Sequence, residues 1–395
     1  MSKPKLIRIT TVPISLKTLL KGQPRFMSAN GFSVLGVSSE GQELQDVRVE
    51  EQIPVIAIQM TRTISLVKDL KSLWRFYKLC KKEKPTIVHS HTPKAGIVGM
   101  LGAKLAGVPI RLHTVAGMPL MEASGIKRVI LDLVEKLTYA AAIRVYPNSK
   151  KLYDFILKEG YTKKKKLKVI SNGSSNGIDT NFFCREQMVS GIRISLREKL
   201  EIFSDDFVFI FVGRLVGDKG INELIKAFQK MDKQKNSERK INVKILLVGS
   251  LESELDPLHP DTLQEIENNP NIISVGFQKD VRPYFSISDA LVFPSYREGF
   301  PNVVMQAGAM ELPCIVSDIN GCNEIIIEGE NGTIIPVKNS EAIYHAMEKF
   351  VNDEYYYERL KKRSREMIQN RYEQQVVWNA LLEEYKTLLK ERGVS

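Results

Sequence analysis

Short apolar runs alternate with amphipathic stretches along nearly the whole chain, and they do so in two rounds. In the first round the apolar runs read as strands: Leu6–Thr10, Phe32–Val37, Thr86–Ser90, Ile110–His113, Ala142–Tyr146 and Leu167–Ile170. Helical patterns lie between them, for example Leu66–Lys82, Gly96–Ala106 and Ile126–Ala140. Because strands that alternate with helices form parallel sheets covered on both faces, this pattern predicts α/β architecture.

The second round begins near residue 207. Its strand-like runs are Phe207–Val212, Val243–Val248, Ala290–Phe293 and Cys314–Val316. A polar segment without a strong period, Asn181–Ser204, separates the rounds, and 395 residues are too many for one ordinary core. We therefore predict two doubly wound, Rossmann-like domains facing a cleft, at residues 1–185 and 200–372. A helical pattern over Tyr355–Glu391 follows, and residues 373–395 are expected to pack back on the first domain.

The net charge of +11 is divided unevenly along the chain. Residues 1–190 carry 31 Lys and Arg against 14 Asp and Glu, whereas residues 191–395 carry 26 against 32. Such asymmetry indicates that the first half meets an anion, with nucleic acid and an anionic membrane surface as candidates. A basic surface that only aids solubility is the alternative. Few aromatic platforms lie among the charges, which disfavours nucleic acid.

The segment Thr61–Lys82 places Leu, Trp and Phe at helical spacing among basic residues. This pattern suits a helix that lies on an anionic membrane, and it equally suits a core-facing helix with a hydrated basic side. No run of about 18 apolar residues and no signal-peptide core is present, so we expect a cytoplasmic protein. The four scattered cysteines are expected to be free thiols: Cys80, Cys184, Cys314 and Cys322.

Two stretches of the second half suit an anionic ligand. After the strand that ends at Gly213 come Arg214 and Lys219, and a helical pattern begins just after Gly220. Glycines admit a ligand close to the backbone, and a fork and a point charge suit a diphosphate. Solvated surface cations are the alternative interpretation.

The other stretch is Arg297–Gly308, "REGFPNVVMQAG". Glu298 lies just past a strand, and Pro301 suits the first position of a helix. Gln306 then lies about a turn and a half into that helix. A carboxylate beside an anion site is favourable if it accepts hydrogen bonds from hydroxyls, and sugar hydroxyls fit that need. Glu298 as a surface residue favoured by the helix dipole is the alternative.

Three histidines fall at two strand ends of the first half: His89, His91 and His113. A cleft role is one interpretation, and hydrogen-bonded packing residues are the other. No carboxylate completes a metal-binding set, so no metal is expected.

Taken together, the motifs resemble those of the retaining, nucleotide-sugar-dependent glycosyltransferases of the GT-B fold, which build capsule, O-antigen and lipid-linked glycans. The matching runs are Gly213–Gly220, Ser171–Asp179, Ser288–Ser295 and Glu298–Gln306. The run His89–Gly96, together with His113, resembles the subset that acts on bacterial surface polysaccharides.

This resemblance implies site roles. Arg214 and Lys219 would bind the donor diphosphate, Glu298 would hold donor-sugar hydroxyls, and His113 would lie near the reacting sugar. The remaining donor-binding positions would be Gly213, Gly299, Phe300, Pro301, Asn302 and Gln306. Position 306 is usually acidic in the family, so Gln306 is expected to contact the ribose with altered nucleotide affinity.

On the acceptor side, many relatives carry a Gly-Gly pair after the first strand, where this chain has Thr10–Ser15. Gly22 is expected to serve instead, with His91 and Lys94 nearby.

The implied reaction moves a sugar from a nucleoside-diphosphate sugar, UDP before others, to a glycan or polyprenyl-diphosphate-linked hydroxyl. The configuration would be retained, and no metal or other cofactor would be needed. The basic first half would take the acceptor at the inner face of the cell membrane. A nucleotide-sugar 2-epimerase of the same fold and a non-enzymatic sugar-nucleotide-binding protein are the alternatives.

Overall fold

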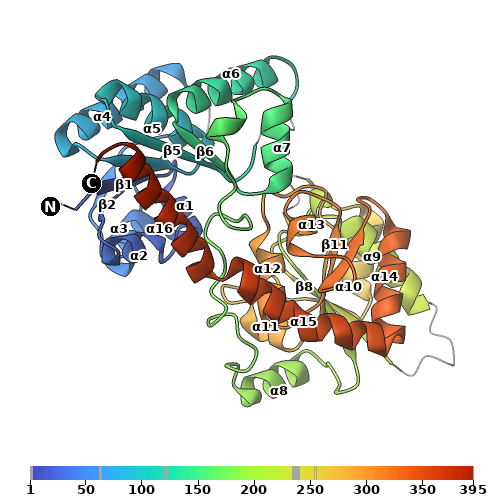
Figure 1. Cartoon of the computed structure of the whole chain (residues 1–395). Helices are drawn as coiled ribbons and strands as arrows, with labels where there is room; N and C mark the ends of the chain where they lie inside the picture. Colours follow the sequence, from blue (N-terminus) through green and yellow to red (C-terminus); the bar gives the residue numbers. More distant parts are fainter. Residues whose placement is uncertain are drawn as a thin grey trace. The chain divides into compact units, whose positions relative to one another are not determined.

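The chain folds into two compact units, shown in the computed structural model of Figure 1. The first unit comprises Met1–Gly177 and Gln374–Ser395, and the second comprises Ile178–Glu373. The structure describes residues 3–61, 65–118, 120, 123–233, 241–252, 254 and 256–394. Residues 62–64, near the start of the predicted basic amphipathic segment Thr61–Lys82, lie outside that part.

The first unit is built on a six-stranded parallel sheet with the order β3-β2-β1-β4-β5-β6. Its strands are β1 (Lys5–Ile9), β2 (Ser33–Ser38), β3 (Val55–Ala57), β4 (Ile87–Ser90), β5 (Ile110–Val115) and β6 (Arg144–Pro147). Leu6 of β1 lies opposite Val34 on one side and Ile87 on the other. The strand order reverses between β1 and β4, which is where ligands enter doubly wound sheets.

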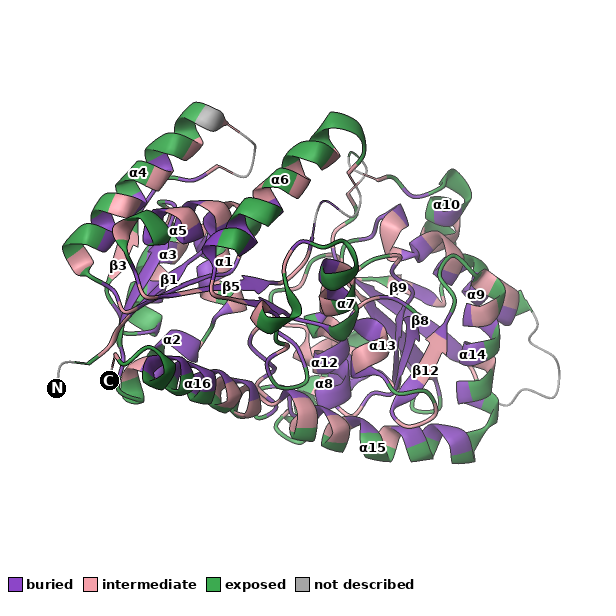
Figure 2. Ribbon diagram, turned by 45° about the horizontal axis from the view of Figure 1, so that its top comes forward, coloured by how far each residue is buried: buried purple, intermediate pink, exposed green. Residues whose placement is uncertain are grey.

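Helices cover both faces of this sheet (Figures 1 and 2). One layer contains α4 (Leu66–Glu83), α5 (Pro93–Ala106), α6 (Gly125–Ala141) and α7 (Lys150–Lys158). The other contains α1 (Pro13–Leu19), α2 (Gln23–Ala29), α3 (Gln42–Glu50) and α16 (Gln374–Glu391). Successive residues of a strand point to opposite faces of the sheet. Ile7 and Ile9 pack against the layer that contains α4–α7, and Leu6 packs against the layer that contains α1–α3 and α16.

The second unit repeats the plan with the strand order β12-β11-β10-β7-β8-β9. Its strands are β7 (Phe207–Val212), β8 (Val243–Val248), β9 (Ile272–Ser274), β10 (Ala290–Phe293), β11 (Cys314–Ser317) and β12 (Gly332–Ile335). Its helices are α8 (Ser190–Lys199), α9 (Ile221–Lys233), α10 (Pro260–Asn268), α11 (Arg282–Ser286), α12 (Asn302–Ala309), α13 (Cys322–Ile325), α14 (Ser340–Asn352) and α15 (Glu354–Tyr372). The order reverses between β7 and β10.

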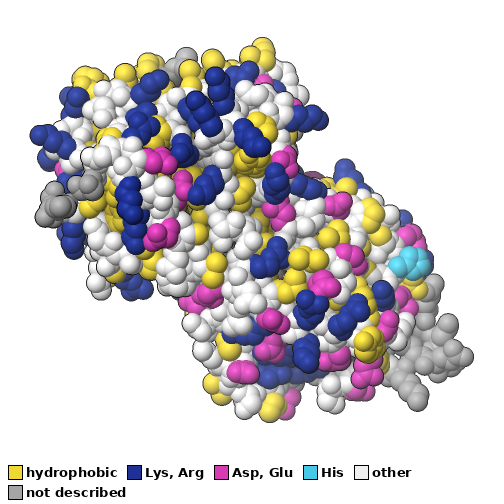
Figure 3. Space-filling model, viewed as in Figure 1, with side chains coloured by type: hydrophobic (Ala, Val, Ile, Leu, Met, Phe, Trp, Pro, Cys, Tyr) yellow, Lys and Arg dark blue, Asp and Glu magenta, His cyan; other side chains and the backbone are white. Residues whose placement is uncertain are grey.

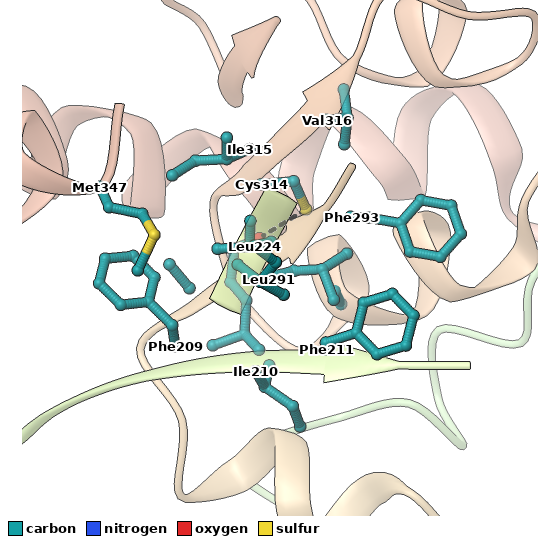
Figure 4. Close-up of a cluster of buried hydrophobic side chains, with 14 of the residues drawn as sticks. Phe209, Ile210, Phe211, Leu224, Leu291, Phe293, Cys314, Ile315, Val316 and Met347 are labelled. Carbon is teal, nitrogen blue, oxygen red and sulfur yellow. Dashed lines mark hydrogen bonds between the residues drawn. The ribbon is translucent and has the colours of Figure 1, made fainter. Parts of the chain in front are cut away.

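The core around β7 and β10, the two strands between which the order reverses, is apolar and tightly packed (Figure 4). The rings of Phe211 and Phe293 stack with centroids 5.9 Å apart, which joins β7 to β10. Cys314 of β11 lies in the same core, where burial raises the pKa of its thiol. No two of the four cysteines are joined in a disulfide, as expected, and all four side chains are buried. The two strands that carry the candidate site therefore rest on a close-packed base.

The structure confirms the two parallel sheets and most predicted strands, with some corrections. Leu167–Ile170 is not a strand, because only one isolated bridge, from Leu167 to Val145, follows the turn at residues 164–166. The short strands β3, β9 and β12 were missed. The predicted helix over Tyr355–Glu391 is two helices, because Glu373 takes an extended conformation (φ −53°, ψ 137°) between α15 and α16.

The predicted domain limits also shift. Ile178 and Phe183 join the second unit's core, and the Ile178 N–H donates to the Tyr372 carbonyl at 2.8 Å. Residues 178–199 therefore belong to the second unit rather than to the end of the first or to a linker. Gln374–Ser395 packs in the first unit, where Tyr385 of α16 is fully buried.

Candidate functional site

The loops that follow β7 and β10 form the candidate site of the second unit. These strands are adjacent and parallel, with Phe209 opposite Ala290, so their carboxyl ends meet at one edge of the sheet. Arg214 follows the end of β7 by two residues, and Glu298 follows β10 by five residues. The side chains predicted to bind a diphosphate and a sugar thus start from neighbouring strands at the reversal point.

Gly220 brings the two loops into contact. It has φ +72°, and a Cβ built on it would lie 2.2 Å from the carbonyl oxygen of Pro294. Only glycine tolerates both conditions without strain. The turn at Gly217–Lys219 therefore lies against the end of β10, just before α9 begins at Ile221 as predicted.

Lys219 and Glu298 meet as a result of this contact. Lys219 Nζ lies 2.5 Å from Glu298 Oε1, and the two side chains are 15% and 19% exposed. The Ser295 hydroxyl donates to the same carboxylate oxygen at 3.3 Å. The structure therefore joins two of the residues predicted from separate motifs, and it adds Ser295, which the sequence analysis missed.

Further contacts hold the turn against the Glu298 loop. The Tyr296 N–H donates to the Asp218 carbonyl at 2.8 Å, and the Arg297 guanidinium donates to the Asp218 carboxylate at 2.8 and 3.1 Å. The Tyr296 hydroxyl donates to the Glu223 carboxylate at 2.8 Å. Burial and Glu223 raise the pKa of Tyr296, so the phenol remains a donor. No sequence motif pointed to these partners, because they are set by the folded loops.

Asn320 fixes the backbone around Glu298 from the next strand. It lies after β11, and its amide donates to the carbonyls of Gly299 at 2.5 Å and Glu298 at 3.3 Å. The sequence analysis missed this residue as well. Its place just past the end of a neighbouring strand is a signal that could have found it.

The start of α12 differs from the prediction. Pro301 is the N-cap residue, with an extended ψ of 112°, and Asn302 is the first helical residue. The prediction placed Pro301 itself in the helix; its fixed φ suits either position, so the sequence did not distinguish them. Gln306 is half-buried on α12, and the Phe300 ring packs against Tyr372 with centroids 5.5 Å apart.

Arg214 is on the surface and already has a partner. Its guanidinium lies 2.9 Å from the Glu252 carboxylate, and the two side chains are 47% and 30% exposed. Exposed pairs of this kind contribute little, about 0–1 kcal/mol. An anion of higher charge can therefore replace Glu252 as the partner of Arg214 at small cost.

In the first unit, His113 is not at a strand end. β5 continues to Val115, and the His113 ring is 2% exposed, with Nδ1 2.8 Å from the Ser90 hydroxyl. A Cβ on Gly96 would lie 2.6 Å from the ring. Burial lowers the pKa of His113 to about 4, so the ring is neutral. The expected placement at the end of the strand is therefore corrected to a packed position inside the sheet layer, and the expected role near the reacting sugar stays a prediction.

His91 is also buried, at 3% exposure, beside His89 with ring centroids 4.2 Å apart. Burial and the nearby Arg8 charge hold the pKa of His91 well below its usual value. Neither ring nitrogen has a hydrogen-bond partner among the described residues. The ring lines a cavity of about 20 Å³ with Asn148 and Ser175, which is room for about one water molecule.

The other two residues expected on the acceptor side have structural partners. Lys94 is ion-paired with Asp69 of α4, and its side chain is 11% exposed. Gly22 has φ +80°, donates its N–H to Glu51 at 2.6 Å, and leaves no room for a Cβ beneath the ring of Trp378. Their conformations and contacts follow from folding of the first unit.

The described residues contain no group of three or more His, Cys, Asp or Glu side chains placed to hold a metal ion. They also contain no helix that is both long and apolar enough to span a bilayer.

Comparison with known proteins gives matches to each unit. Residues 25–173 match the family described as "Glycosyl transferase 4-like domain", and residues 193–367 match "Glycosyl transferases group 1". A structure of Anabaena HepE in complex with UDP and glucose superposes with a TM-score of 0.77 at 17% identity, covering 97% of this chain and 100% of the other. That likeness shows the fold.

Two curated relatives match over most of their length. The capsular polysaccharide biosynthesis glycosyltransferase CapM of Staphylococcus aureus is 36% identical over 394 residues, with 99% of each chain covered. The UDP-Gal:alpha-D-GlcNAc-diphosphoundecaprenol alpha-1,3-galactosyltransferase of Escherichia coli is 29% identical, over 88% of this chain and 89% of that protein. The chain therefore belongs to the GT-B glycosyltransferases, in the group that includes enzymes of capsular and lipid-linked polysaccharide synthesis.

Proposed function

We propose that this glycosyltransferase moves a sugar from a UDP-sugar to a hydroxyl group of a glycan or polyprenyl-diphosphate-linked acceptor, with retention of the anomeric configuration. The observation that carries the proposal is the Lys219–Glu298 pair at the strand reversal of the second unit, with Arg214 on the same loop as Lys219. A cation beside a carboxylate offers a diphosphate partner and a hydroxyl acceptor within one small site.

In this reaction the bond between the anomeric carbon and the diphosphate oxygen breaks, and a bond to the acceptor oxygen forms on the same face of the sugar. The acceptor proton passes to an oxygen of the leaving phosphate. Lys219 and Arg214 stabilise the charge that builds up on the diphosphate, and Glu298 accepts hydrogen bonds from donor-sugar hydroxyls. Two cationic side chains supply the neutralisation, so the reaction is proposed to proceed without a metal.

The donor nucleotide and the acceptor class are argued from the relatives. The name of the Escherichia coli relative states a UDP-sugar donor and a diphosphoundecaprenol acceptor. Gln306 on α12 is proposed to bond the ribose through its amide, which offers both an acceptor and a donor. Turnover in EDTA equal to turnover in magnesium would support metal independence, and the anomeric proton coupling of the product reports retention.

The first test is a thermal-shift and hydrolysis screen of UDP-, GDP- and ADP-sugars on the wild type, Glu298→Ala and the matched control Glu267→Ala. Glu267 is an exposed carboxylate on α10. We expect a UDP-sugar to raise Tm and to be slowly hydrolysed by the wild type and the control, with both effects lost in Glu298→Ala.

The alternatives give different results in the same screen. An epimerised UDP-sugar formed without acceptor would favour a 2-epimerase. A shift in Tm without turnover, even with lipid-linked acceptors, would favour a binding protein. Absence of any shift at millimolar donor would contradict the assigned site.

A further inference from the structure

The helices α4 and α6 leave a large part of their apolar side chains uncovered. Both belong to the α4–α7 layer of the first unit, and both contact α5, which lies between them (Figure 2). The uncovered side chains are between 38% and 80% exposed: Val67, Leu70 and Trp74 on α4, and Ile126, Val129, Ile130, Leu133 and Leu137 on α6.

The apolar stripe of α6 faces away from the core. All 17 residues of the helix are described, and four of them are buried, from Glu135 onwards. The exposed apolar residues recur every three or four positions from Ile126 to Leu137, so they form one stripe. A helix in a soluble domain normally turns such a stripe inward.

The sequence left open whether α4 is a membrane-facing or a core-facing helix, and the burial of its side chains shows two different sides. Phe76, Leu79 and Cys80 are buried in the core, whereas Leu70 and Trp74 are more than half exposed. The helix therefore has a core side and an uncovered apolar side. The Trp74 ring stacks on Tyr77 with centroids 5.1 Å apart, and Lys78 Nζ lies 5.2 Å above it. An exposed Trp beside a cation is typical of the interface between lipid headgroups and acyl chains.

Basic side chains accompany the apolar ones. Those exposed on α4 are Lys68, Lys71, Arg75, Lys78, Lys81 and Lys82. Nearby carboxylates have cationic partners: Asp69 pairs with Lys94, and Asp132 pairs with Arg128. Figure 3 shows basic and hydrophobic side chains interspersed on the first unit.

The charge of the whole unit has the same sign. The first unit carries 33 Lys and Arg against 15 Asp and Glu, whereas the second carries 24 against 31. The positive surface around α4 and α6 therefore belongs to a unit with a net charge of +18.

We propose that α4 and α6 form a docking surface for an anionic lipid bilayer, with the apolar stripe entering the headgroup region and the Lys and Arg side chains meeting acidic lipids. Charge complementarity favours a membrane over a second copy of this chain, because two first units, each with a net charge of +18, would repel each other. Nucleic acid is bound through phosphate contacts and aromatic stacking, so a stripe of Ile, Val and Leu does not suit it. The inference rests on the proposed lipid-linked acceptor, and it identifies the surface that would bring the enzyme to it.

The test is co-sedimentation of the full-length protein with vesicles of phosphatidylglycerol and phosphatidylcholine, and with phosphatidylcholine alone, over a series of salt concentrations. We expect binding to the anionic vesicles that weakens with salt. The double variant Ile126→Ser/Leu133→Ser should bind at least about tenfold more weakly, and Lys71→Gln/Lys78→Gln should lose much of the salt dependence. Phe277→Ser, which removes an exposed aromatic side chain of the second unit, is the control and should bind as wild type.

Trp74 supplies a second readout. Its emission should shift to shorter wavelength on vesicle addition, and the shift should disappear in Trp74→Phe. Circular dichroism of each variant checks that the fold is kept.

Several outcomes would overturn the proposal: no vesicle binding at low salt, equal binding by wild type and the Ile126→Ser/Leu133→Ser variant, or a wild-type dimer that this variant dissociates. Preferential binding of RNA, with vesicles failing to compete, would also do so. Hydrolysis of a soluble UDP-sugar is measured in parallel, because it does not need the membrane. Hydrolysis without vesicle binding contradicts the docking surface alone, whereas vesicle binding without hydrolysis contradicts the proposed function alone.

Discussion

At the residue scale, the candidate site depends on pairs of opposite charge that differ in exposure. The Lys219–Glu298 pair is mostly buried, at 15% and 19% exposure, whereas Arg214 and Glu252 are largely in water. Removing one partner of a buried pair leaves the other uncompensated, so substitutions at Lys219 and Glu298 should have larger effects than substitutions at the surface pair. In the proposed reaction, Lys219 is also the cation that an arriving diphosphate would meet inside the site.

Lys219→Gln tests the proposed electrostatic role. Loss of one charged contact that forms fully in the transition state should lower kcat by about two to three orders of magnitude. The donor Kd should change far less. Lys226→Gln, at an exposed position of α9, is the matched control and should keep wild-type kcat. Steady-state kinetics with a separate measurement of donor binding decide the outcome, and an unchanged kcat in Lys219→Gln would remove Lys219 from the mechanism.

At the scale of elements, the long apolar strands could be predicted from the sequence, whereas the short edge strands, the strand ends and the contacts between loops could not. The run Phe207–Val212 is fully apolar because it lies in mid-sheet, and this alone identified β7. β3 and β9 have three residues each at the sheet edges, too few for a period to appear. His113 was assigned to the end of its strand because the apolar run ends there, while hydrogen bonding carries β5 on to Val115. Asn320 was missed because its contacts form only when the loop after β11 meets the loop after β10. Ser295 was missed because its contact with Glu298 depends on the folded shape of the loop after β10.

Gly220 holds the loop after β7 against the end of β10, so its replacement should disturb the site clearly. Gly220→Ala adds a left-handed strain of about 1–2 kcal/mol and drives a methyl group into the Pro294 carbonyl. The turn must then move away from β10, separating Lys219 from Glu298. We expect a loss of stability well above that strain, together with weaker donor binding.

Gly276→Ala is the matched control for this substitution. Gly276 has φ +67° in the same unit, but nothing lies within 4 Å of the added Cβ. Gly276→Ala should lower the free energy of unfolding by about 1–2 kcal/mol and leave donor binding unchanged. Urea unfolding and donor titration of both variants make the comparison, and equal effects of the two substitutions would show that close contact at Gly220 is unimportant.

At the scale of the whole molecule, the two units have separate cores and different contents of buried ionisable groups. The first unit buries Arg8 together with three histidines: His89, His91 and His113. Tyr385 of α16 links two of these groups, because its hydroxyl lies 2.9 Å from Arg8 and 2.6 Å from His89 Nδ1. The last 22 residues of the chain therefore complete a polar network in the core of the first unit, whose other part is the N-terminal segment Met1–Gly177.

The first unit should therefore be destabilised by mild acid. Burial lowers the pKa of His113 to about 4 and holds those of His89 and His91 well below 6.5. The unfolded chain then binds more protons than the folded one, so the contribution of the histidines to stability is complete above about pH 6.5 and falls as the pH drops towards 4. His113 alone contributes about 3 kcal/mol to this loss. Glu135, whose pKa burial raises to about 7, acts in the opposite sense, since its stabilising effect is lost as the pH rises from 4.5 to 7.

Tryptophan fluorescence can follow this loss in the first unit alone, because Trp74 and Trp378 both lie there. We expect the urea midpoint reported by fluorescence to fall steadily between pH 6.5 and 4.5. His113→Gln keeps a polar side chain but removes the titrating group, so its midpoint should fall less over the same interval even if its stability at pH 7.5 is lower. Comparing the slope with pH, rather than the absolute stability, separates titration from packing damage. A variant slope equal to that of the wild type would mean that His113 already titrates near its ordinary pKa, and that solvent reaches a ring which the structure places inside the sheet layer.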